Sequence, residues 1–249
     1  MRKTELRVIG CGDAFGSGGR YQTCFMIDDA QGRFVVDFGA SSMTALKAQN
    51  VDPASIDAVY LTHLHGDHFG GLPYLLSHRR FISNPETPLT IAGPPGFSER
   101  LRALSDCVFP DIWADGWGLD LQLVEIPPGE ECQIAGRTVR SEKVRHSAGP
   151  EPATALRISG GGIVIAYSGD TGWTDALIDI SAGSDLFICD CNDRHDQSFD
   201  GHLSYDTLCR QLSRLDTKRL IVTHLGPDMI SATDTPMVER AFEGMVIRF

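Results

Sequence analysis

The chain has 249 residues, 42% of them hydrophobic, and a net charge of −11, a composition typical of a globular protein. The acidic balance argues against the broad basic surface of most nucleic-acid-binding proteins. No apolar run approaches the length of a membrane span, and the start, MRKTELRVIGCG, lacks the apolar stretch of a signal peptide. We therefore expect a cytoplasmic protein without membrane association, folded as a single domain over residues 1–249.

The chain alternates between strand and helix patterns, which predicts one α/β fold with strands and helices in layers. In the first half, strands are expected over 5–10, 23–28, 33–39, 56–62 and part of 86–96, and helices over 41–50, 74–80 and 97–109. In the second half, strands are expected over part of 119–129, 137–146, 154–159, 161–170, 185–190 and 219–226, and helices over 204–215 and, weakly, 237–245.

Two of these strands run into the same tripeptide, Thr62-His63-Leu64 and Thr223-His224-Leu225. The repetition is either a coincidence or the trace of two similar halves whose corresponding strands end at these residues.

The seven cysteines are spaced irregularly and form no C-x-x-C pair, so we expect reduced thiols rather than a zinc ribbon. A soft-metal site at Cys189 and Cys191 is a weaker alternative.

The stretch THLHGDHFGG places His63, His65, Asp67 and His68 within six positions, directly after a short apolar strand. Imidazole and carboxylate groups are good ligands for zinc, iron and manganese. His63 and His65 can hold one ion together, while Asp67 and His68 can face a second. Buried without partners, each group would cost about 1–3 kcal/mol, so a purely structural role is the weaker interpretation.

Four groups cannot complete two metal shells, so we expect further ligands at other strand ends that face the same edge. His146 ends the run SEKVRH, Asp170 ends IVIAYSGD and His224 ends RLIVTH. Each residue alone has an ordinary structural explanation, but their order after H-x-H-x-D-H favours a metal centre.

In this pattern the sequence resembles the metallo-β-lactamase-fold hydrolases, which carry H-x-H-x-D-H and then a His, an Asp and a final His at strand ends. The resemblance covers nearly the whole chain and implies a four-layer αββα sandwich of two similar halves. It also implies that one metal is held by His63, His65 and His146, that a second is held by Asp67, His68 and His224, and that Asp170 bridges the two.

The resemblance further implies two divalent ions, with Zn²⁺ the first candidate and Mn²⁺ or Fe²⁺ as alternatives, since the same ligands accept each. Two such ions, about 3.5–4 Å apart, would hold a bridging hydroxide that attacks the substrate. They would also stabilise the negative charge that develops on oxygen. Asp67 could orient this nucleophile or accept its proton.

Further segments resemble the ribonuclease Z-like branch of these hydrolases. The opening VIGCGDAFGSGGR has that branch's Gly-rich loop and an arginine, and DGHLSYDTL resembles its segment with an extra histidine, His202. The resemblance implies that Asp190 partners His202, which could act as a general acid for a leaving alkoxide. Alternatively, His202 only neighbours the cap of a helix at Ser204. Ser17 and Arg20 could contact an anionic substrate, and Arg20 could equally be a surface residue.

Two departures weaken a role in tRNA 3′ processing. Branch members that act on precursor tRNA carry a flexible Gly/Pro-rich arm, but only 23 residues separate His146 from Asp170 and 53 separate Asp170 from His224. LGPDM also follows the last histidine, where those enzymes have a serine and an arginine. We therefore expect hydrolysis of a small or cyclic phosphodiester.

Other functions stay open at the level of sequence, because the fold by itself does not select a substrate. The same metal centre could serve an arylsulfatase, a lactone, ester or thioester hydrolase, or an armless tRNA 3′-processing endonuclease. A non-catalytic ligand-binding protein is a remote alternative. The expected partner is a small anionic molecule rather than nucleic acid, and the resemblance alone suggests a homodimer.

Overall fold

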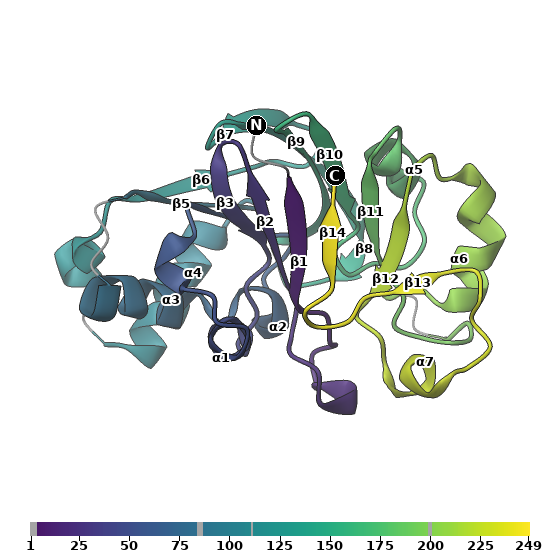
Figure 1. Cartoon of the computed structure of the whole chain (residues 1–249). Helices are drawn as coiled ribbons and strands as arrows, with labels where there is room; N and C mark the ends of the chain where they lie inside the picture. Colours follow the sequence, from purple (N-terminus) through teal and green to yellow (C-terminus); the bar gives the residue numbers. More distant parts are fainter. Residues whose placement is uncertain (1–3, 84–86, 111, 199–200) are drawn as a thin grey trace.

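Two seven-stranded β-sheets lie face to face, with helices on both outer surfaces (Figure 1). The computed structural model describes residues 4–83, 87–110, 112–198 and 201–249. The first sheet comprises β1 (Glu5–Gly10), β2 (Cys24–Asp29), β3 (Gly32–Val36), β4 (Ala58–Tyr60), β5 (Leu89–Gly93), β6 (Leu121–Glu125) and β14 (Val246–Arg248). The second comprises β7 (Glu131–Ile134), β8 (Arg137–Ser147), β9 (Pro152–Gly160), β10 (Ile163–Tyr167), β11 (Leu186–Asp190), β12 (Leu220–Thr223) and β13 (Glu239–Arg240).

The helices are short and divide between the two outer faces (Figure 1). On the side of the first sheet lie α1 (Ser42–Ala48), α2 (Gly66–Phe69), α3 (Leu72–His78) and α4 (Phe97–Val108). On the side of the second sheet lie α5 (Ala176–Ser181), α6 (Tyr205–Gln211) and α7 (Pro227–Ser231). None of the described helices combines the length and the apolar character needed to cross a bilayer.

Three apolar layers follow from the alternation of side chains along the strands. Ile27 packs between the two sheets, whereas its neighbour Met26 packs against the helices of the first sheet. In the second sheet, Ile188 faces inward and Phe187 faces the helices. All four side chains are buried, and each contributes about 1.5–3 kcal/mol to stability by leaving water. The predicted αββα sandwich is thereby confirmed.

Both sheets have the same succession of strand directions. From β14 to β6, and again from β7 to β13, three antiparallel pairings are followed by three parallel ones. The two repeated tripeptides, however, follow strands of different rank. His63 follows β4, the fifth strand of its sheet, whereas His224 follows β12, the sixth strand of its own. The interpretation that these tripeptides end corresponding strands is therefore wrong, and β11 is the counterpart of β4.

The predicted weak helix over 237–245 is also wrong. Residues in this segment form β13, which pairs in parallel with β12, and Ala241 N donates to Val222 O at 2.8 Å. Gly244, with a φ of 84°, then turns the chain towards β14. The edge of β12 supplies hydrogen-bond partners to this segment. The local sequence does not show that such an edge lies beside it. The same reason applies to β7 and β14, short strands with no counterpart among the predicted ones.

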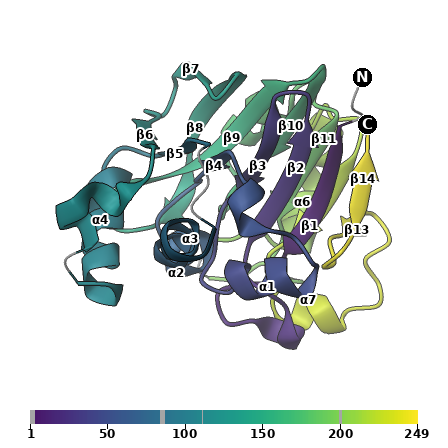
Figure 2. The ribbon, with the colours of Figure 1, turned by 60° about the vertical axis from the view of Figure 1, so that its left-hand side comes forward.

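The parallel strands of both sheets bring their carboxyl ends to one edge of the molecule. α1 and α7, which follow β3 and β12, lie close to this edge in Figure 1 and in the turned view of Figure 2. The metal-ligand candidates that the sequence analysis placed at strand ends all occur at this edge, as described below.

A buried ion pair joins the two sheets at the opposite end of the strands. Arg137, at the start of β8, donates to Asp29, at the end of β2, with Nε–Oδ2 and Nη2–Oδ1 distances of 2.8 and 2.6 Å. Both side chains are at most 2% exposed, and the guanidinium lies over the ring of Phe34.

We expect Arg137→Met to lower the free energy of unfolding by about 3–5 kcal/mol, because it leaves the Asp29 carboxylate buried without its partner. Urea unfolding would measure the loss. Arg248→Met is the matched control, since the Arg248 side chain in the Arg248–Glu5 pair is 71% exposed and such a pair contributes about 1 kcal/mol or less. Equal losses in the two variants would contradict the role assigned to the buried pair.

Candidate metal centre

All seven ligand candidates lie together where the two sheets meet at this edge. Their ligand atoms form two groups, and within each group all atoms lie within 4.8 Å of one another. Asp170 belongs to both groups, which are His63, His65, His146 and Asp170, and Asp67, His68, Asp170 and His224. The structure thus places a shared carboxylate between two sets of imidazoles.

Distances within the second group are short. His68 Nε2 lies 3.2 Å from both Asp67 Oδ2 and Asp170 Oδ1. His224 Nε2 lies 3.1 Å from Asp67 Oδ2 and 3.3 Å from Asp170 Oδ2. These four side chains are buried, so the donors face one another rather than solvent.

The first group is slightly wider and reaches towards the surface. His65 Nδ1 lies 3.1 Å from His146 Nε2, and Asp170 Oδ2 lies 3.7 Å from His63 Nε2 and 4.0 Å from His146 Nε2. His63 is fully buried and the His146 side chain is 4% exposed, whereas His65 is half-buried.

Two glycines allow the loop after β4 to approach the loop after β3. A Cβ at Gly39 would lie 2.1 Å from Asp67 O, and a Cβ at Gly71 would lie 2.4 Å from Gly39 O. No side chain fits at either position, so the glycines hold the one-turn helix α2 in place. α2 carries Asp67 and His68, and His65 stands directly before it.

Asp37 orients two of the histidines, and the sequence analysis did not find it. It accepts from His68 Nδ1 at 2.7 Å and from the amide and hydroxyl of Thr62, both at 2.8 Å. Because the Thr62 hydroxyl donates to Asp37, it accepts from His63 Nδ1, 3.1 Å away. Both imidazoles are therefore turned with Nε2 towards the site, as outer hydrogen bonds commonly arrange for metal-binding histidines. The available signal was an acidic residue directly after a buried strand.

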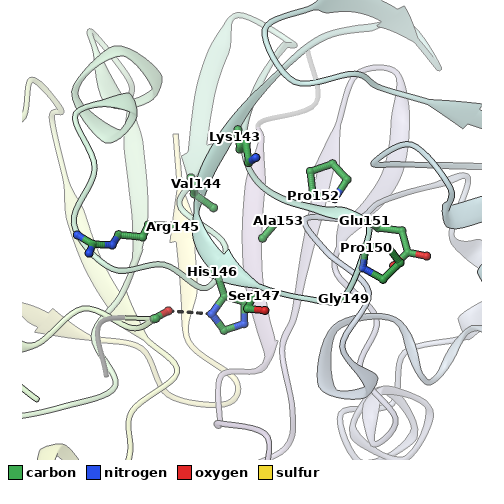
Figure 3. Close-up of a pocket in the computed structure, with 11 residues that line it drawn as sticks. Lys143, Val144, Arg145, His146, Ser147, Gly149, Pro150, Glu151, Pro152 and Ala153 are labelled. Atoms are coloured by element: carbon green, nitrogen blue, oxygen red, sulfur yellow. Dashed lines mark hydrogen bonds between the residues drawn. The ribbon is translucent and has the colours of Figure 1, made fainter. Parts of the chain in front are cut away.

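His146 is oriented in the same way by the backbone. Its Nδ1 donates to Gly201 O at 2.8 Å, the contact drawn as a dashed line in Figure 3. Its Nε2 is left for the site. Three of the five histidines in the two ligand groups are thus oriented by a hydrogen bond at Nδ1.

Two site residues have a strained backbone. Asp37 and His224 have φ values of 58° and 59°, in the left-handed region that non-glycine residues adopt at a cost of about 1–3 kcal/mol. Asn192 helps to hold His224, because its Nδ2 donates to His224 O at 2.9 Å. Strain of this kind accumulates at functional sites.

The donor set fits divalent cations. His63 Nε2 and Asp170 Oδ1 are buried and have no hydrogen-bond partner within the described part of the chain. Leaving each of these atoms unsatisfied would cost about 1–3 kcal/mol, a penalty that ligation removes. Imidazole nitrogens with carboxylate oxygens are the donors typical of zinc, iron and manganese sites. The residues therefore form a candidate site for divalent metal ions.

The carboxyl groups of Asp67 and Asp170 face the imidazoles of His68 and His224. Burial alone would raise the pKa values of Asp67 and Asp170, but the imidazoles of His68 and His224 outweigh burial and hold both values well below their ordinary range.

His202 and Asp190 form a pair beside the metal ligands. His202 Nδ1 lies 2.9 Å from Asp190 Oδ2, and its ring lies 4.9 Å from that of His146 and 5.1 Å from that of His224, between ring centroids. Burial disfavours the charged imidazole, but Asp190 outweighs this effect and raises the pKa of His202 to about 9. Ser204 caps α6 by accepting from Thr207 N, so the helix cap and the His202–Asp190 pair coexist.

A cavity of about 530 Å³ opens over the metal site. Its inner wall is polar and includes His65, Asp67, His146, Asp170, His202 and His224. Its outer wall includes Ala14, Phe15 and Pro227. A second cavity, of about 600 Å³, is lined by His146 and the rest of the end of β8, by the following turn and by the start of β9 (Figure 3).

Ser17 and Arg20, the expected substrate contacts, differ in position. Ser17 lines the 530 Å³ cavity, but its hydroxyl donates to Asp13 at 2.6 Å. Arg20 is not among the residues described as lining this cavity. It donates to Ala241 O at 3.1 Å and so supports the backbone of the β13–β14 turn.

Cys189 and Cys191 face the apolar layer of the second sheet, while Asp190 between them faces the site. All seven cysteines are free thiols.

Comparison with known proteins agrees with this geometry. A model of the Anti-Pycsar protein Apyc1 family matches residues 4–246. An uncharacterised protein of Mycobacterium tuberculosis is 33% identical over 209 residues, which cover 78% of this chain and 70% of that protein. The structure of the metallo-β-lactamase fold protein YhfI from Bacillus subtilis has a TM-score of 0.80, at 22% identity and full coverage of both chains. The short form of human tRNase Z has a TM-score of 0.76, at 22% identity over 98% of both chains.

The fold and the site therefore define a protein of the metallo-β-lactamase fold, in the class of metallohydrolases, and the predicted likeness to the ribonuclease Z-like branch is confirmed. Within that class, the chain belongs to the Anti-Pycsar Apyc1 family.

We expect Asp37→Ala to weaken metal binding about 10- to 100-fold, because His68 loses the hydrogen bond that orients it and the Thr62 hydroxyl beside His63 loses its acceptor. Metal retained per chain after dialysis against graded chelator concentrations would measure the change. Asp28→Ala, which removes an ion pair with Arg33, is the control. Unchanged metal retention in folded Asp37→Ala would contradict the role assigned to Asp37.

Proposed function

We propose that the protein is a metal-dependent phosphodiesterase that opens the phosphodiester ring of cyclic nucleoside monophosphates. The observation that carries the proposal is the pair of ligand groups sharing Asp170 at the base of a 530 Å³ cavity. A cavity of this size suits a small molecule, and family membership supports a cyclic nucleotide, since the Anti-Pycsar Apyc1 family degrades such molecules.

The seven ligands would hold two divalent ions, with Zn²⁺ the first candidate for this set of imidazoles and carboxylates. When bound, such ions stabilise negative charge on phosphoryl oxygens and lower the pKa of water. Asp67, which lines the cavity, would orient the attacking water or accept its proton. Asp67 also belongs to the second ligand group. The positioning of the attacking water and the binding of metal would therefore depend on the same side chain.

His202 would protonate the leaving group. Hydrolysis adds one water across a P–O bond, so phosphorus gains the water oxygen while the ribose oxygen departs and takes a proton. Asp190 holds Nδ1 of His202 at 2.9 Å, which leaves Nε2 as the atom available to the cavity. Positioned proton transfer of this kind typically accelerates a reaction about 10²–10⁴-fold.

We expect the purified protein to hydrolyse 3′,5′-cyclic nucleotides to nucleoside monophosphates, and dialysis against a chelator to abolish the activity until Zn²⁺ or Mn²⁺ is restored. Chromatography of the products would measure the reaction, with His65→Ala as the inactive control. Aryl sulfates, lactones, thioesters and precursor tRNA belong in the same panel. Turnover of one of these, without turnover of any cyclic nucleotide, would refute the proposed substrate class.

We expect His202→Ala to lower kcat on a cyclic nucleotide about 10²–10⁴-fold and to lower it much less on bis-p-nitrophenyl phosphate. The ribose alkoxide needs a proton to leave, whereas p-nitrophenolate leaves without one. Steady-state kinetics on the two substrates, with metal content measured in parallel, would test the role. An equal loss on both substrates would indicate that His202 only supports the site.

A further inference from the structure

The loop at 13–19 presents an aromatic side chain at the outer end of the cavity. Phe15 lines that cavity and is 93% exposed, the largest fraction for a bulky apolar side chain in the described part of the chain. An exposed phenylalanine contributes little to the stability of the fold that carries it. Its ring is therefore free to contact a molecule that enters the cavity.

The loop is built to hold Phe15 in place. The Asp13 carboxylate, only 3% exposed, accepts from Phe15 N at 3.2 Å, from Ser17 N at 2.8 Å and from the Ser17 hydroxyl at 2.6 Å. Gln22 Nε2 donates to Ala14 O at 2.9 Å. These bonds hold both the backbone before Phe15 and the backbone after it.

α7 supports the loop from the second sheet's side. A Cβ at Gly18 would lie 3.2 Å from the Ile230 side chain, so the loop and the helix are in close contact. Figures 1 and 2 both show the segment after β1 projecting beyond the strand ends beside α7. Pro227, the first residue of α7, lines the same outer wall as Ala14 and Phe15.

The cavity thus has two chemically different ends. The inner end carries imidazoles and carboxylates that suit a phosphodiester, and the outer end carries an aromatic ring with small apolar neighbours. A nucleoside phosphate has the same division, with its charge at one end and a flat base at the other. Aromatic side chains stack on any nucleobase, because every base has a π-face.

Several donors of the loop are already used within the loop. The amides of residues 15 and 17 donate to the Asp13 side chain, and the amides of Gly16 and Gly19 donate to backbone carbonyls within the loop. The Ser17 hydroxyl also donates to Asp13. These donors are therefore unavailable to a ligand, whereas the face of the Phe15 ring is available.

We propose that Phe15 is the stacking platform for the nucleobase of the substrate, and that it favours cyclic nucleotides over cyclic phosphates that lack a base. This inference rests on the proposed function, and it adds a specificity residue that touches the substrate far from the reacting atoms.

The test compares wild-type protein, Phe15→Ala and Phe15→Trp, loaded with Zn²⁺, on three substrates. These are 3′,5′-cyclic AMP, 3′,5′-cyclic CMP and a ribose 3,5-cyclic phosphate with a methoxy group in place of the base. Phe15→Ala should lower kcat/KM on both nucleotides roughly 10- to 100-fold, mainly through KM, and leave the base-free substrate unaffected. Phe15→Trp should retain activity on both nucleotides. Phe81→Ala, which removes a phenylalanine that is 62% exposed on another part of the surface, is the matched control.

Each alternative outcome has a distinct meaning. Undiminished nucleotide hydrolysis by Phe15→Ala would overturn the stacking role and leave the proposed function intact. An equal loss on the base-free substrate would also overturn it, because the residue would then act on the loop rather than on the base. Wild-type protein that hydrolyses no cyclic nucleotide would refute the proposed function itself, and with it the stacking role, before any variant is compared.

Discussion

The metal centre depends on two sheets holding their strand ends at a fixed separation. α2 after β4 carries Asp67 and His68, while Asp170 and His224 follow strands of the second sheet. Oxygens of Asp170 lie 3.2 Å from His68 and 3.7 Å from His63, so a small shift of one sheet would open both ligand groups. The apolar layer between the sheets resists such a shift, because protein interiors are close-packed.

The ligand candidates are oriented by hydrogen bonds on the side of the ring that faces away from the site. Asp37 reaches His68 directly and His63 through Thr62, and the carbonyl of Gly201 holds His146. These bonds engage Nδ1 of each ring, so that Nε2 faces the site. The residue type alone does not decide which nitrogen faces the site. The left-handed backbone of Asp37 and His224 is the local cost of this arrangement, and packing around the site offsets it.

The cavity shows how one fold can serve many hydrolases. Its inner end, with the His202–Asp190 pair beside the metal ligands, defines a type of chemistry and leaves the substrate open. Its outer end belongs to a loop and to α7, elements that can vary without disturbing the sheets. Substrate choice in this chain is therefore expected to depend on residues such as Phe15, which contribute little to the fold.

The sequence by itself determined the fold class and the identity of the ligand candidates. Four metal-binding side chains in six positions, followed by His146, Asp170 and His224 at strand ends, carry their chemistry in residue type and order. Only the tertiary structure decided the contacts of Asp37, the exposed position of Phe15 at the cavity, the position of Arg20 away from the cavity lining, and the pairing of β13 with β12. The physical reason is that hydrogen bonds, side-chain exposure and strand pairing at a sheet edge depend on which distant segments lie side by side in the fold. Local sequence patterns do not contain that information.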